Sequence, residues 1–512
     1  MSDLFGVEWL PLPRVPQMAE IDRRAQEENG VPERLLMENA GRSIALVVDR
    51  LFPRGRVAAA LGSGHNGGDA YIALRALSTW GRDVVALTDG DRPPNPILAH
   101  LWELPTAPAP DAGSIFAGAD VILDGLLGTG AAGPPREGTA RIIEAINSSG
   151  GSVVAVDGPS GVDFSTGQVP GASVNADVTV SLGFPKLGLL FQPARSRCGR
   201  IMVAEIGFPP VTADEVGAAV ITPAWASARL PARPPDAHKG DLGYLLIVAS
   251  RFGMAGAAAL AARGALAAGA GIVRIASDAA NREIHQAAAP ETIFVDIDNP
   301  DALMEAGKWA DALVLGPGFG TDNVALQRLE AALAATEEKP TLIDADGLNL
   351  FADRADELAA LAQKRPLAIT PHPGEMRRLQ GVGIDEVIAD PVAAAHRAAG
   401  RFSAAVLLKG APSVVASPGT VALVSSSGSS AAASGGSGDV LAGVCGALLA
   451  AGLTPRDALA VGLFYAGRAA ELGPVRGRSS LDLVGGLAAA LKTPGAESPP
   501  LPFVLFDQPP RR

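Results

Sequence analysis

Short apolar runs alternate with stretches of helical periodicity along most of the chain, and many of these runs end in glycine or an acidic residue. Residues 17–50 repeat apolar positions at helical spacing, which predicts two helices near the N-terminus. Strands separated by helices are typical of βαβ units and a parallel sheet, so we predict a doubly wound α/β domain. Its predicted strands are 57–61, 83–87, 120–123, 152–156 and 176–182.

The second half of the chain repeats this alternation and predicts a second βαβ sheet. An alanine-rich helix is expected at 255–268, and a buried apolar helix is expected to run through Leu449. Polar residues again collect directly after the apolar runs, which places a site at the same edge of this sheet. The predicted strands are 244–248, 271–275, 312–315, 341–343, 367–370 and 405–408.

The chain has 512 residues, which is more than one ordinary core accommodates, so two or three domains are expected. Residues 207–240 are rich in proline and lack a sustained period, which indicates the junction. Beyond Lys492 the chain is expected to be loose. The predicted division is a domain at 1–215, a domain at 216–495 and a Pro-rich tail at 496–512.

Composition excludes several classes of protein. The hydrophobic content of 48% is that of a globular chain, and the net charge of −12 argues against nucleic-acid binding. Cys198 and Cys445 lie far apart and support neither a disulfide framework nor a zinc site, so we expect both to be buried. We find no signal pattern and no apolar run of about 18 residues, and we expect a cytoplasmic protein without a membrane partner.

The stretch Ser434-Gly435-Gly436-Ser437-Gly438-Asp439 precedes the apolar helix of the second half. Glycines let a backbone approach a ligand closely, and the free N–H groups of a helix start attract phosphates. Asp439 would then lie beside the phosphate, where a base for a hydroxyl is needed. A plain Gly-Ser loop with Asp439 as helix cap explains the same residues, and both interpretations stay open at this point.

Several strands of the first half end in polar loops. The strand at 57–61 runs into Gly62-Ser63-Gly64-His65-Asn66-Gly67-Gly68-Asp69, with a helix expected from Tyr71, an arrangement found at phosphate sites of doubly wound folds. The next strands run into Asp124 and Asp157. Each acid alone is explained by turn chemistry, but together Asn66, Asp124, Asp157 and Ser160 offer hard oxygen ligands for a cation.

Glu38 and Asn39 form a polar pair inside an otherwise apolar helical pattern. Such a pair serves as a cap or lines a site, and the sequence does not decide between the two.

The motifs taken together resemble a known family, the bifunctional NAD(P)H-hydrate repair enzymes, over roughly residues 10–490. This resemblance implies a Rossmann-like, doubly wound epimerase domain followed by a ribokinase-like α/β domain, an ADP-dependent dehydratase. The motifs that carry it are Asn66-Gly67-Gly68-Asp69, Gly128-Thr129-Gly130, Val156-Asp157-Gly158-Pro159-Ser160-Gly161, Phe184-Pro185-Lys186-Leu187-Gly188, His238-Lys239-Gly240, His372-Pro373-Gly374-Glu375 and Gly435-Gly436-Ser437-Gly438-Asp439.

The resemblance also implies site residues, with hydrated NADH or NADPH and ADP as the small-molecule substrates and a homo-oligomer as the assembly. In the epimerase, the hydrate contacts are His65, Asn66, Gly67, Gly68, Asp69, Gly128, Thr129, Gly130, Ala131, Ala132, Gly133, Pro134 and Asp157. Potassium (K⁺) would be held by Asn66, Asp124 and Ser160. In the dehydratase, the hydrate contacts are Ala257, Gly318, His372 and Asp439, and the nucleotide contacts are Lys409, Gly410, Ala411, Pro412, Ser413 and Gly438.

Asp439 and Asp157 are the expected catalytic residues. Asp439 would accept the proton of the C6 hydroxyl of the hydrate during a transient phosphoryl transfer from ADP, with Mg²⁺ on the nucleotide phosphates. Asp157 would shuttle a proton in the epimerase, with Lys186 as a possible helper. Two alternatives remain: a kinase for a vitamin alcohol in the second domain, and a non-catalytic binding module in the first.

The chain departs from the family pattern in several positions. They are Ala70 after Asp69, His65 where asparagine is frequent, Ser413 where threonine is frequent, Gly347 in an Asp-Ala-Asp-Ala-Leu-Asn type of motif, and Ala466 where histidine is expected. The last departure concerns a detail of the nucleotide pocket.

Overall fold

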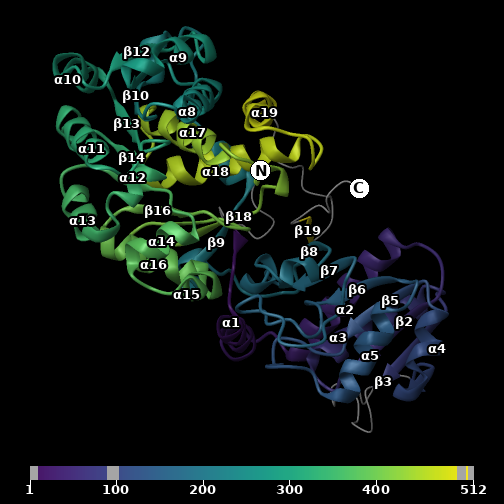
Figure 1. Ribbon diagram of the computed structural model, residues 1–512. Coiled ribbons are helices and arrows are strands. Elements are labelled where there is room, and N and C mark those ends of the chain that lie inside the picture. The colour runs from purple at the N-terminus through teal and green to yellow at the C-terminus, as the bar shows by residue number, and fades with distance from the viewer. Residues whose placement is uncertain (1–9, 89–102, 493–502, 506–512) are drawn as a thin grey trace. The chain divides into compact units, whose positions relative to one another are not determined.

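The computed structural model describes residues 10–88, 103–492 and the backbone of 503–505. The chain divides into two compact units, one of residues 1–218 with 497–512 and one of residues 219–496. Each unit is a sheet flanked by helices, and most neighbouring strands run parallel (Figure 1). The predicted α/β fold class is therefore confirmed for both halves.

The sheet of the N-terminal unit has the order β19-β8-β7-β6-β5-β2-β3-β4, and only the β19–β8 pair is antiparallel. From β2 the chain first builds outward through β3 and β4, then returns to β5 and builds in the other direction. Such a switch point leaves a crevice beyond the carboxyl ends of the two central strands. The strands are β2 Val57–Leu61, β3 Val84–Thr88, β4 Thr106–Pro108, β5 Val121–Gly125, β6 Ser152–Val156, β7 Val178–Leu182, β8 Arg200–Ala204 and β19 Phe503–Leu505.

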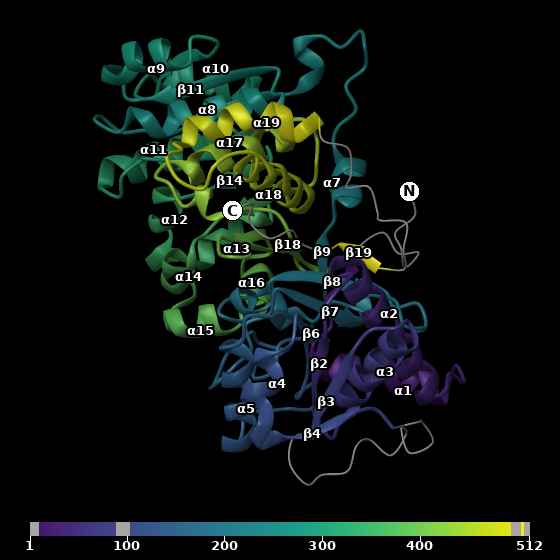
Figure 2. The same cartoon turned by 90° about the vertical axis from the view of Figure 1, so that its right-hand side faces the viewer.

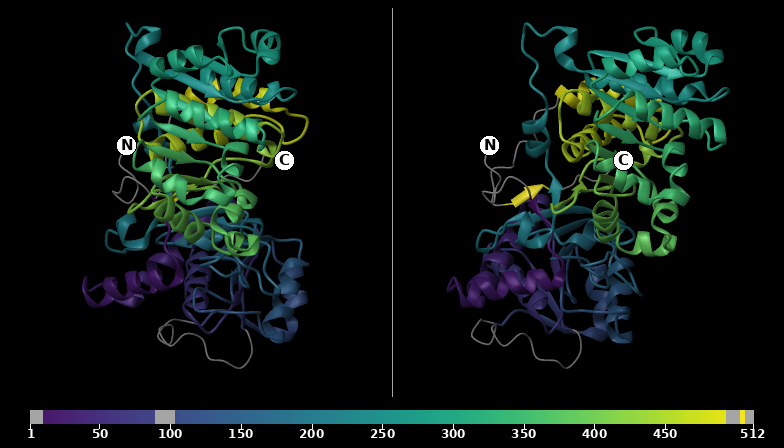
Figure 3. Two further views of the ribbon diagram at one scale, coloured as in Figure 1. Left: turned by 60° about the vertical axis from the view of Figure 1, so that its left-hand side comes forward. Right: turned by 90° about the vertical axis from the view of Figure 1, so that its left-hand side faces the viewer.

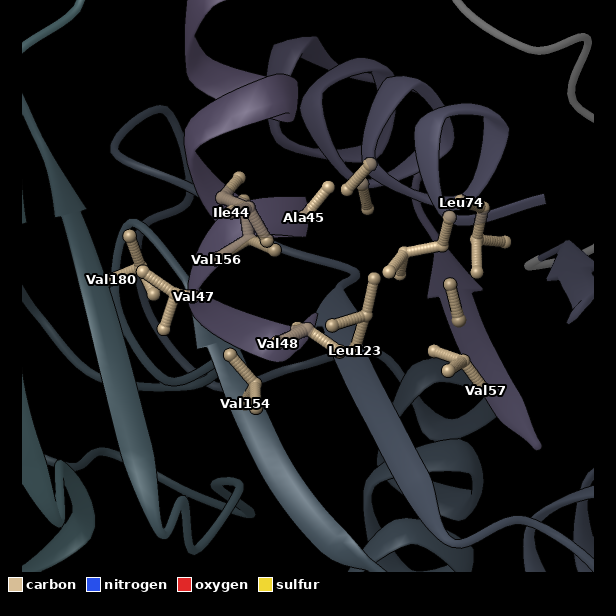
Figure 4. Packing of buried hydrophobic residues seen from close by; sticks show 14 of the residues in the cluster. Ile44, Ala45, Val47, Val48, Val57, Leu74, Leu123, Val154, Val156 and Val180 are labelled. Carbon is tan, nitrogen blue, oxygen red and sulfur yellow. The ribbon is translucent and has the colours of Figure 1, made fainter. Parts of the chain in front are cut away.

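Helices cover both faces of this sheet, with α2 and α3 on one side and α4 and α5 on the other (Figure 2). Val47 and Val48 of α2 pack over Leu123, Val154 and other strand residues in a fully apolar layer (Figure 4). This burial fixes the strands and therefore the loops at their ends. The remaining elements of this unit are β1 Leu10–Pro11, α1 Val15–Glu27, α2 Glu33–Leu51, α3 His65–Thr79, α4 Ala112–Ala117, α5 Glu137–Asn147 and α6 Ala213–Val216.

The sheet of the C-terminal unit has the order β9-β18-β17-β16-β15-β14-β13-β10-β11-β12, parallel from β16 to β12 and antiparallel at β17 and β18. Its switch point lies between β10 and β13. The strands are β9 Ala218–Ile221, β10 Tyr244–Val248, β11 Ile272–Ser277, β12 Ile293–Asp296, β13 Ala312–Leu315, β14 Thr341–Ile343, β15 Leu367–Ile369, β16 Ala405–Leu408, β17 Val414–Ala416 and β18 Ala422–Ser425.

Helices also lie on both faces of this second sheet, with α8, α17 and α18 on one face and α10, α11, α13 and α16 along the other (Figures 1 and 3). The helices are α7 Pro223–Arg229, α8 Ala255–Ala268, α9 Arg282–Ala288, α10 Pro300–Trp309, α11 Asn323–Ala335, α12 Asp346–Asn349, α13 Asp356–Ala362, α14 Pro373–Gln380, α15 Ile384–Ala389, α16 Pro391–Phe402, α17 Ser437–Ala450, α18 Pro455–Glu471 and α19 Ser480–Lys492.

Some features of the structure differ from what the sequence predicted, and others confirm it. The segment 207–240 contains α6, β9 and α7, short elements that the proline content concealed. Residues 503–505 of the tail, expected to be loose, pair with β8, and the rest of the tail beyond residue 492 lies outside the described residues. Cys198 and Cys445 are both free and buried, as predicted. Among the described helices, none has the length and apolar character needed to cross a membrane.

Candidate active sites

The Asn66-Gly67-Gly68-Asp69 motif lies in the first turns of α3, so the expected helix start at Tyr71 is wrong. The helix begins at His65, with Gly64 before it in extended conformation. A Cβ atom at Gly67 would lie 1.9 Å from the carbonyl oxygen of Gly62, in the loop after β2. Only glycine lets the start of α3 approach this loop so closely, and this contact brings the motif to the end of β2.

Asn66, Asp124 and Ser160 come together at this edge, as expected from three strand ends. The Ser160 hydroxyl donates to Asp124 Oδ1 at 2.6 Å, and the Ser160 amide donates to Asp124 Oδ2 at 2.8 Å. Asn66 Nδ2 donates to the carbonyl oxygen of Leu127 at 2.9 Å. A Cβ atom at Gly128 would lie 3.1 Å from the Asn66 Cβ, so the loop after β5 also starts beside Asn66.

Asp124 is completely buried. Burial raises the pKa of its carboxyl to about 6, and hydrogen bonds from Ser160 and Leu126 oppose the shift. Within the described residues, no lysine or arginine forms an ion pair with it. A buried carboxylate with neutral oxygen-bearing neighbours is an environment that a bound monovalent cation would stabilise.

Asp157 occupies the residue directly after β6 and has a left-handed backbone conformation, with φ of 66°. Its Oδ1 accepts a hydrogen bond from the Leu182 amide at 2.9 Å and forms an ion pair with Lys186. The Lys186 ammonium also donates to the Leu182 carbonyl oxygen at 2.8 Å and contacts the Ser181 hydroxyl at 3.4 Å. Lys186 is 1% exposed, so its ammonium is held at the carboxylate.

Asp69 lies close enough to Asp157 and Lys186 for their charges to act on it. Burial raises the pKa of Asp69 well above its usual value, the Asp157 charge adds to the shift, and Lys186 opposes it. Among the described residues, no group forms a hydrogen bond or ion pair with the Asp69 side chain. The motif therefore contributes a second buried carboxyl, on which the charge of Asp157 acts.

The other expected epimerase contacts lie farther from this buried group. Gly130, Ala131, Ala132, Gly133 and Pro134 are exposed in the loop after β5, and His65 is an exposed residue whose Nε2 lies 2.8 Å from Glu33 Oε1. The beginning of this loop, Gly128, packs against Asn66.

The Glu38-Asn39 pair does not cap α2. Glu38 forms an ion pair with Arg75 of α3, and Asn39 Nδ2 donates to the carbonyl oxygen of Ile206 at 2.9 Å. The pair therefore ties α2 to its neighbours, an outcome that neither of the two open alternatives describes.

In the C-terminal unit, Ala257 and Gly318 meet at the switch point. A Cβ atom at Gly318, whose φ is 59°, would lie 2.9 Å from the Ala257 Cβ. The turn after β10 holds both residues, because the Arg251 amide donates to the Gly318 carbonyl oxygen at 2.8 Å and the Ala257 amide donates to the Met254 carbonyl oxygen at 3.2 Å. These two expected hydrate contacts are therefore neighbours.

Asp439 is the third residue of α17, and the residue before the helix is Gly436, with φ of 87°. The interpretation of Asp439 as helix cap is therefore wrong. Burial raises the pKa of Asp439 to about 7, Asp344 and Asp346 add to the shift, and Lys409 opposes it. An acid of this pKa at a helix start is able to accept or return a proton at neutral pH.

Lys409 lies at the centre of the acidic residues. Its Nζ donates to Asp344 Oδ1 at 2.7 Å, and a Cβ atom at Gly438 would lie 3.7 Å from the same Nζ. Burial lowers the pKa of Lys409, but the charges of Asp344, Glu375 and Asp439 outweigh this and leave the pKa above its usual value. The lysine is thus a persistent cation beside the start of α17.

The residues after Lys409 form a compact turn between β16 and β17. The Gly410 amide donates to Ser413 Oγ at 3.1 Å, and Ser413 Oγ lies 3.1 Å from the Gly410 carbonyl oxygen. The turn also contains Ala411 and Pro412. The expected nucleotide contacts Lys409 and Gly438 lie together.

His372 precedes α14 and is fixed by that helix. Its Nδ1 accepts a hydrogen bond from the Gly374 amide at 3.0 Å, and its Nε2 lies 3.3 Å from Glu375 Oε1. Burial together with the charges of Lys409 and Arg378 lowers the pKa of His372. The imidazole is therefore held in one orientation by α14.

Asp344, Asp346 and Glu375 were not among the expected site residues. Burial raises the pKa of Glu375 to about 7, and Asp344 lies 1% exposed beneath Lys409. Asp344 and Asp346 follow β14. The expectation that acidic residues directly after a strand belong to the site therefore applied to them as well. Glu375 belongs to the motif His372-Pro373-Gly374-Glu375 that carried the resemblance, but it lies in the first turn of α14, where its role in the capping box also explains it.

Two family models match parts of the chain. Residues 245–478 match the family model described as NAD(P)H-hydrate dehydratase, and residues 33–188 match the model described as YjeF-related protein N-terminus. The chain is 36% identical to the bifunctional NAD(P)H-hydrate repair enzyme Nnr of Thermofilum pendens over 506 residues, covering 94% of this chain and 96% of the relative. It is also 36% identical to the Escherichia coli enzyme of that name over 463 residues, covering 88% of this chain and 87% of the relative.

Two solved structures are also similar to part of the chain. The ADP/ATP-dependent NAD(P)H-hydrate dehydratase of Bacillus subtilis, crystallised with ATP/Mg²⁺, is 26% identical with a TM-score of 0.47, covering 53% of this chain and 97% of that one. A ribokinase-like superfamily protein of Enterococcus faecalis is 22% identical with a TM-score of 0.48, covering 54% of this chain and 96% of that one. On the identity and coverage of the sequence relatives, the chain belongs to the family of bifunctional NAD(P)H-hydrate repair enzymes.

Proposed function

We propose that the two units carry two steps of one repair reaction. The N-terminal unit interconverts the R and S epimers of hydrated NADH or NADPH, and the C-terminal unit dehydrates the S epimer at the expense of ADP. The observation that carries the second assignment is the cluster of Asp439, Lys409 and Asp344 at the start of α17, where a carboxyl that titrates near neutral pH lies beside a partly buried cation.

In the dehydratase, Asp439 accepts the proton of the C6 hydroxyl while that oxygen attacks the terminal phosphorus of ADP, whose bond to the bridging oxygen breaks as AMP leaves. The Lys409 ammonium and the N–H groups at the start of α17 stabilise the charge on the transferred group. Phosphate then leaves with the C6–O electron pair as the ring nitrogen donates its lone pair, and loss of a proton from C5 restores NAD(P)H. Ala257, Gly318 and His372 hold the hydrate, and the turn from Lys409 to Ser413 with Gly438 holds the nucleotide.

In the epimerase, Asp157 is the acid/base at C6, and the residues from His65 to Asp69 and from Gly128 to Pro134 bind the hydrate. Lys186 was expected as a possible helper of Asp157 in proton transfer, and we propose a different role for it. Its ammonium already contacts three acceptors, so we assign it the role of holding Asp157 in place.

The residues present fit a potassium ion in the epimerase. Asn66, Asp124 and Ser160 would hold it, because they gather oxygen atoms around a buried carboxylate that has no cationic partner among the described residues. The ion would balance that charge and fix the loops after β2 and β5. We keep the homo-oligomer and the cytoplasmic location as predictions.

The described residues do not fit a magnesium ion of their own in the dehydratase. No group of three or more acidic, histidine or cysteine side chains in that part of the chain is arranged to hold a metal. A magnesium ion would therefore depend on the nucleotide phosphates, and we assign it no step.

The test uses the full chain and a mixed-epimer NADH hydrate with ADP, with ATP or without nucleotide. We expect NADH absorbance to recover fully with ADP, with AMP and phosphate formed in equal amounts. A stable phosphorylated product from ATP would instead support a kinase for another alcohol. Without nucleotide, exchange between purified R and S epimers is expected, and its absence would leave the N-terminal unit as a binding module.

A further inference from the structure

The glycine loop before α17 is held by a serine that belongs to another helix. Ser480 is the first residue of α19, a helix that packs against both α8 and α17 (Figure 1), and its side chain is buried. Its Oγ donates to the carbonyl oxygen of Gly435 at 2.6 Å. Because a carbonyl oxygen has no proton to give, the one proton of the Ser480 hydroxyl lies in this hydrogen bond. The Ser434 hydroxyl, 3.4 Å from Ser480 Oγ, is therefore the donor in the contact between the two serines.

The next residue of the loop, Gly436, is enclosed by the same serine and by α8. A Cβ atom at Gly436 would overlap Leu260 Cδ1 of α8 and would lie 3.2 Å from Ser480 Oγ. The φ of Gly436 is 87°, a conformation that side chains other than glycine rarely adopt. The loop is thus held between α8 and α19 directly before it enters α17.

The hydrogen bond from Ser480 also sets the direction of one amide. The peptide bond between Gly435 and Gly436 is not among the cis bonds of the described chain, so its carbonyl oxygen and its N–H point to opposite sides. The carbonyl oxygen is directed at Ser480, and the N–H of Gly436 therefore points away from that side chain. This peptide can rotate only if the hydrogen bond from Ser480 breaks.

The start of α17 leaves several amides open. The N–H groups of Gly436, Gly438 and Asp439 have no hydrogen-bond acceptor in the described part of the chain, whereas the Val440 amide donates to the Gly436 carbonyl oxygen at 3.1 Å. Lys409 adjoins them, because its Nζ would lie 3.7 Å from a Cβ atom at Gly438. Open amides at a helix start, with a lysine beside them, are suited to the oxygens of a phosphoryl group.

Ser480 keeps a competing acceptor away from these amides. Gly435 lies four residues before Asp439, which is the spacing of an α-helical hydrogen bond. Without Ser480, the Gly435 carbonyl would be free to turn toward α17 and accept from the Asp439 amide. The helix would then begin one residue earlier, and that amide would be lost to a phosphoryl group.

We propose that Ser480 is a positioning residue of the dehydratase, which holds the Gly435 carbonyl away from α17 so that the loop amides stay open to the phosphoryl group transferred from ADP. Ser480 acts through Gly435 and touches no reacting atom. This inference rests on the proposed dehydratase function and deepens it, because it identifies a residue that shapes the phosphoryl site from outside the loop.

The direct test is Ser480→Ala in the full chain, with the binding of ADP and of AMP measured by calorimetry without hydrate. AMP lacks the terminal phosphoryl group, so only ADP uses the loop amides. We expect Kd for ADP to rise at least about tenfold, the value of one hydrogen bond to a charged group, and Kd for AMP to change by less than about threefold. An ADP constant that does not rise, or equal changes in both constants, would overturn the proposal.

Dehydration kinetics provide a readout that a purely structural role would not change. In Ser480→Ala we expect kcat to fall by about 10–100-fold, because the amides act on the charge of the transferred group. KM for the hydrate should stay the same, because Ala257, Gly318 and His372 are the residues that hold it. A kcat equal to that of the unaltered chain, or an equal rise in KM for hydrate and for ADP, contradicts the proposal.

Ser479→Ala is the matched control. Ser479 also lies at the start of α19, but its hydroxyl donates to Asp482 Oδ2 at 2.8 Å and so serves its own helix. We expect this variant to leave the binding of ADP and AMP unchanged. An effect on ADP as large as that of Ser480→Ala would show that the start of α19 matters as a whole, and would overturn the assignment to the Ser480 hydroxyl.

Ser480→Thr and Ser480→Val form a second pair, because the two side chains have nearly the same size and only threonine keeps the hydroxyl. We expect the ratio of the ADP and AMP constants to be closer to that of the unaltered chain for threonine than for valine, and equal ratios would overturn the proposal. This pair decides the question if Ser480→Ala fails to fold. Failure of the unaltered chain to restore NADH with ADP would overturn the proposed dehydratase function itself, whereas an ADP-to-AMP ratio that Ser480→Ala leaves unchanged overturns only this inference.

Discussion

Replacing Asp439 by asparagine should abolish dehydration and at the same time stabilise the C-terminal unit. The pKa of Asp439 rises from 3.8 to about 7 in the folded protein, so the carboxyl binds its proton more tightly folded than unfolded. The stability of the folded state therefore falls as pH rises through the window between these two values. Asp439→Asn lacks this titration, so its advantage is absent below about pH 4 and complete above about pH 7.

The magnitude follows from the size of the shift. Roughly three pKa units at about 1.36 kcal/mol each give an upper bound of about 4 kcal/mol for holding the ionised carboxylate in place. Asp344 and Lys409 adjust when the charge is removed, so we expect a gain in the free energy of unfolding of about 1–4 kcal/mol at pH 8.5. Turnover should fall by several orders of magnitude, because the proton acceptor is gone.

Asp482 provides a control at the same position of another helix. It is the third residue of α19, and its pKa is lowered by hydrogen bonds from Ser479. Asp482→Asn should therefore destabilise the unit slightly above about pH 4, the opposite sign, and leave turnover unchanged. Hydrogen exchange of peptides from 219–492, followed in denaturant at pH 4 and pH 8.5, measures both variants. The reasoning would be refuted if the gain in the free energy of unfolding of Asp439→Asn over the unaltered chain were no larger at pH 8.5 than at pH 4.

Three further predictions concern charge, packing and the cation. Lys409→Met should move the acid limb of the dehydratase pH profile upward, since Lys409 lowers the pKa of Asp439, and an unmoved limb would contradict this. Gly67→Ala should destabilise the N-terminal unit by about 1–3 kcal/mol in hydrogen exchange, because its Cβ would meet a carbonyl oxygen at 1.9 Å, whereas Gly64→Ala has open space and should not. Potassium should raise the thermal midpoint of the unaltered chain but not of Asp124→Asn.

The strands at the centre of each sheet could be predicted from the sequence because a buried parallel strand is a continuous apolar run followed by turn residues. The predicted ranges 57–61 and 312–315 coincide with β2 and β13. The edge strand β12, with Ile293 exposed, carries no such signal and was missed, and the antiparallel β17 and β18, which are short buried apolar runs, were missed as well. Whether a strand could be predicted from the sequence therefore depended more on its position in the sheet than on the strand propensity of its residues.

The sites could be predicted only in part, because strand ends identify which residues gather but not how their side chains pair. The Gly67-Gly68 sequence argues against a helix by propensity, yet α3 begins before it, since the close approach to Gly62 is a tertiary requirement. Lys409 was expected to contact the nucleotide, and its ion pair with Asp344 joins residues 65 positions apart, a separation at which local pattern carries no information.

The two lysines explain why one chain can carry two different reactions on similar sheets. Lys186 divides its ammonium among Asp157, a carbonyl oxygen and a hydroxyl, so its charge is used within the protein. That arrangement suits epimerisation, in which protons move and no group with extra charge is transferred. Lys409 donates one hydrogen bond, to Asp344, among the described residues, and it adjoins Gly438 at the start of α17. A cation with donors to spare is what phosphoryl transfer requires, because negative charge builds up on the transferred group. The difference in lysine coordination therefore matches the difference in chemistry.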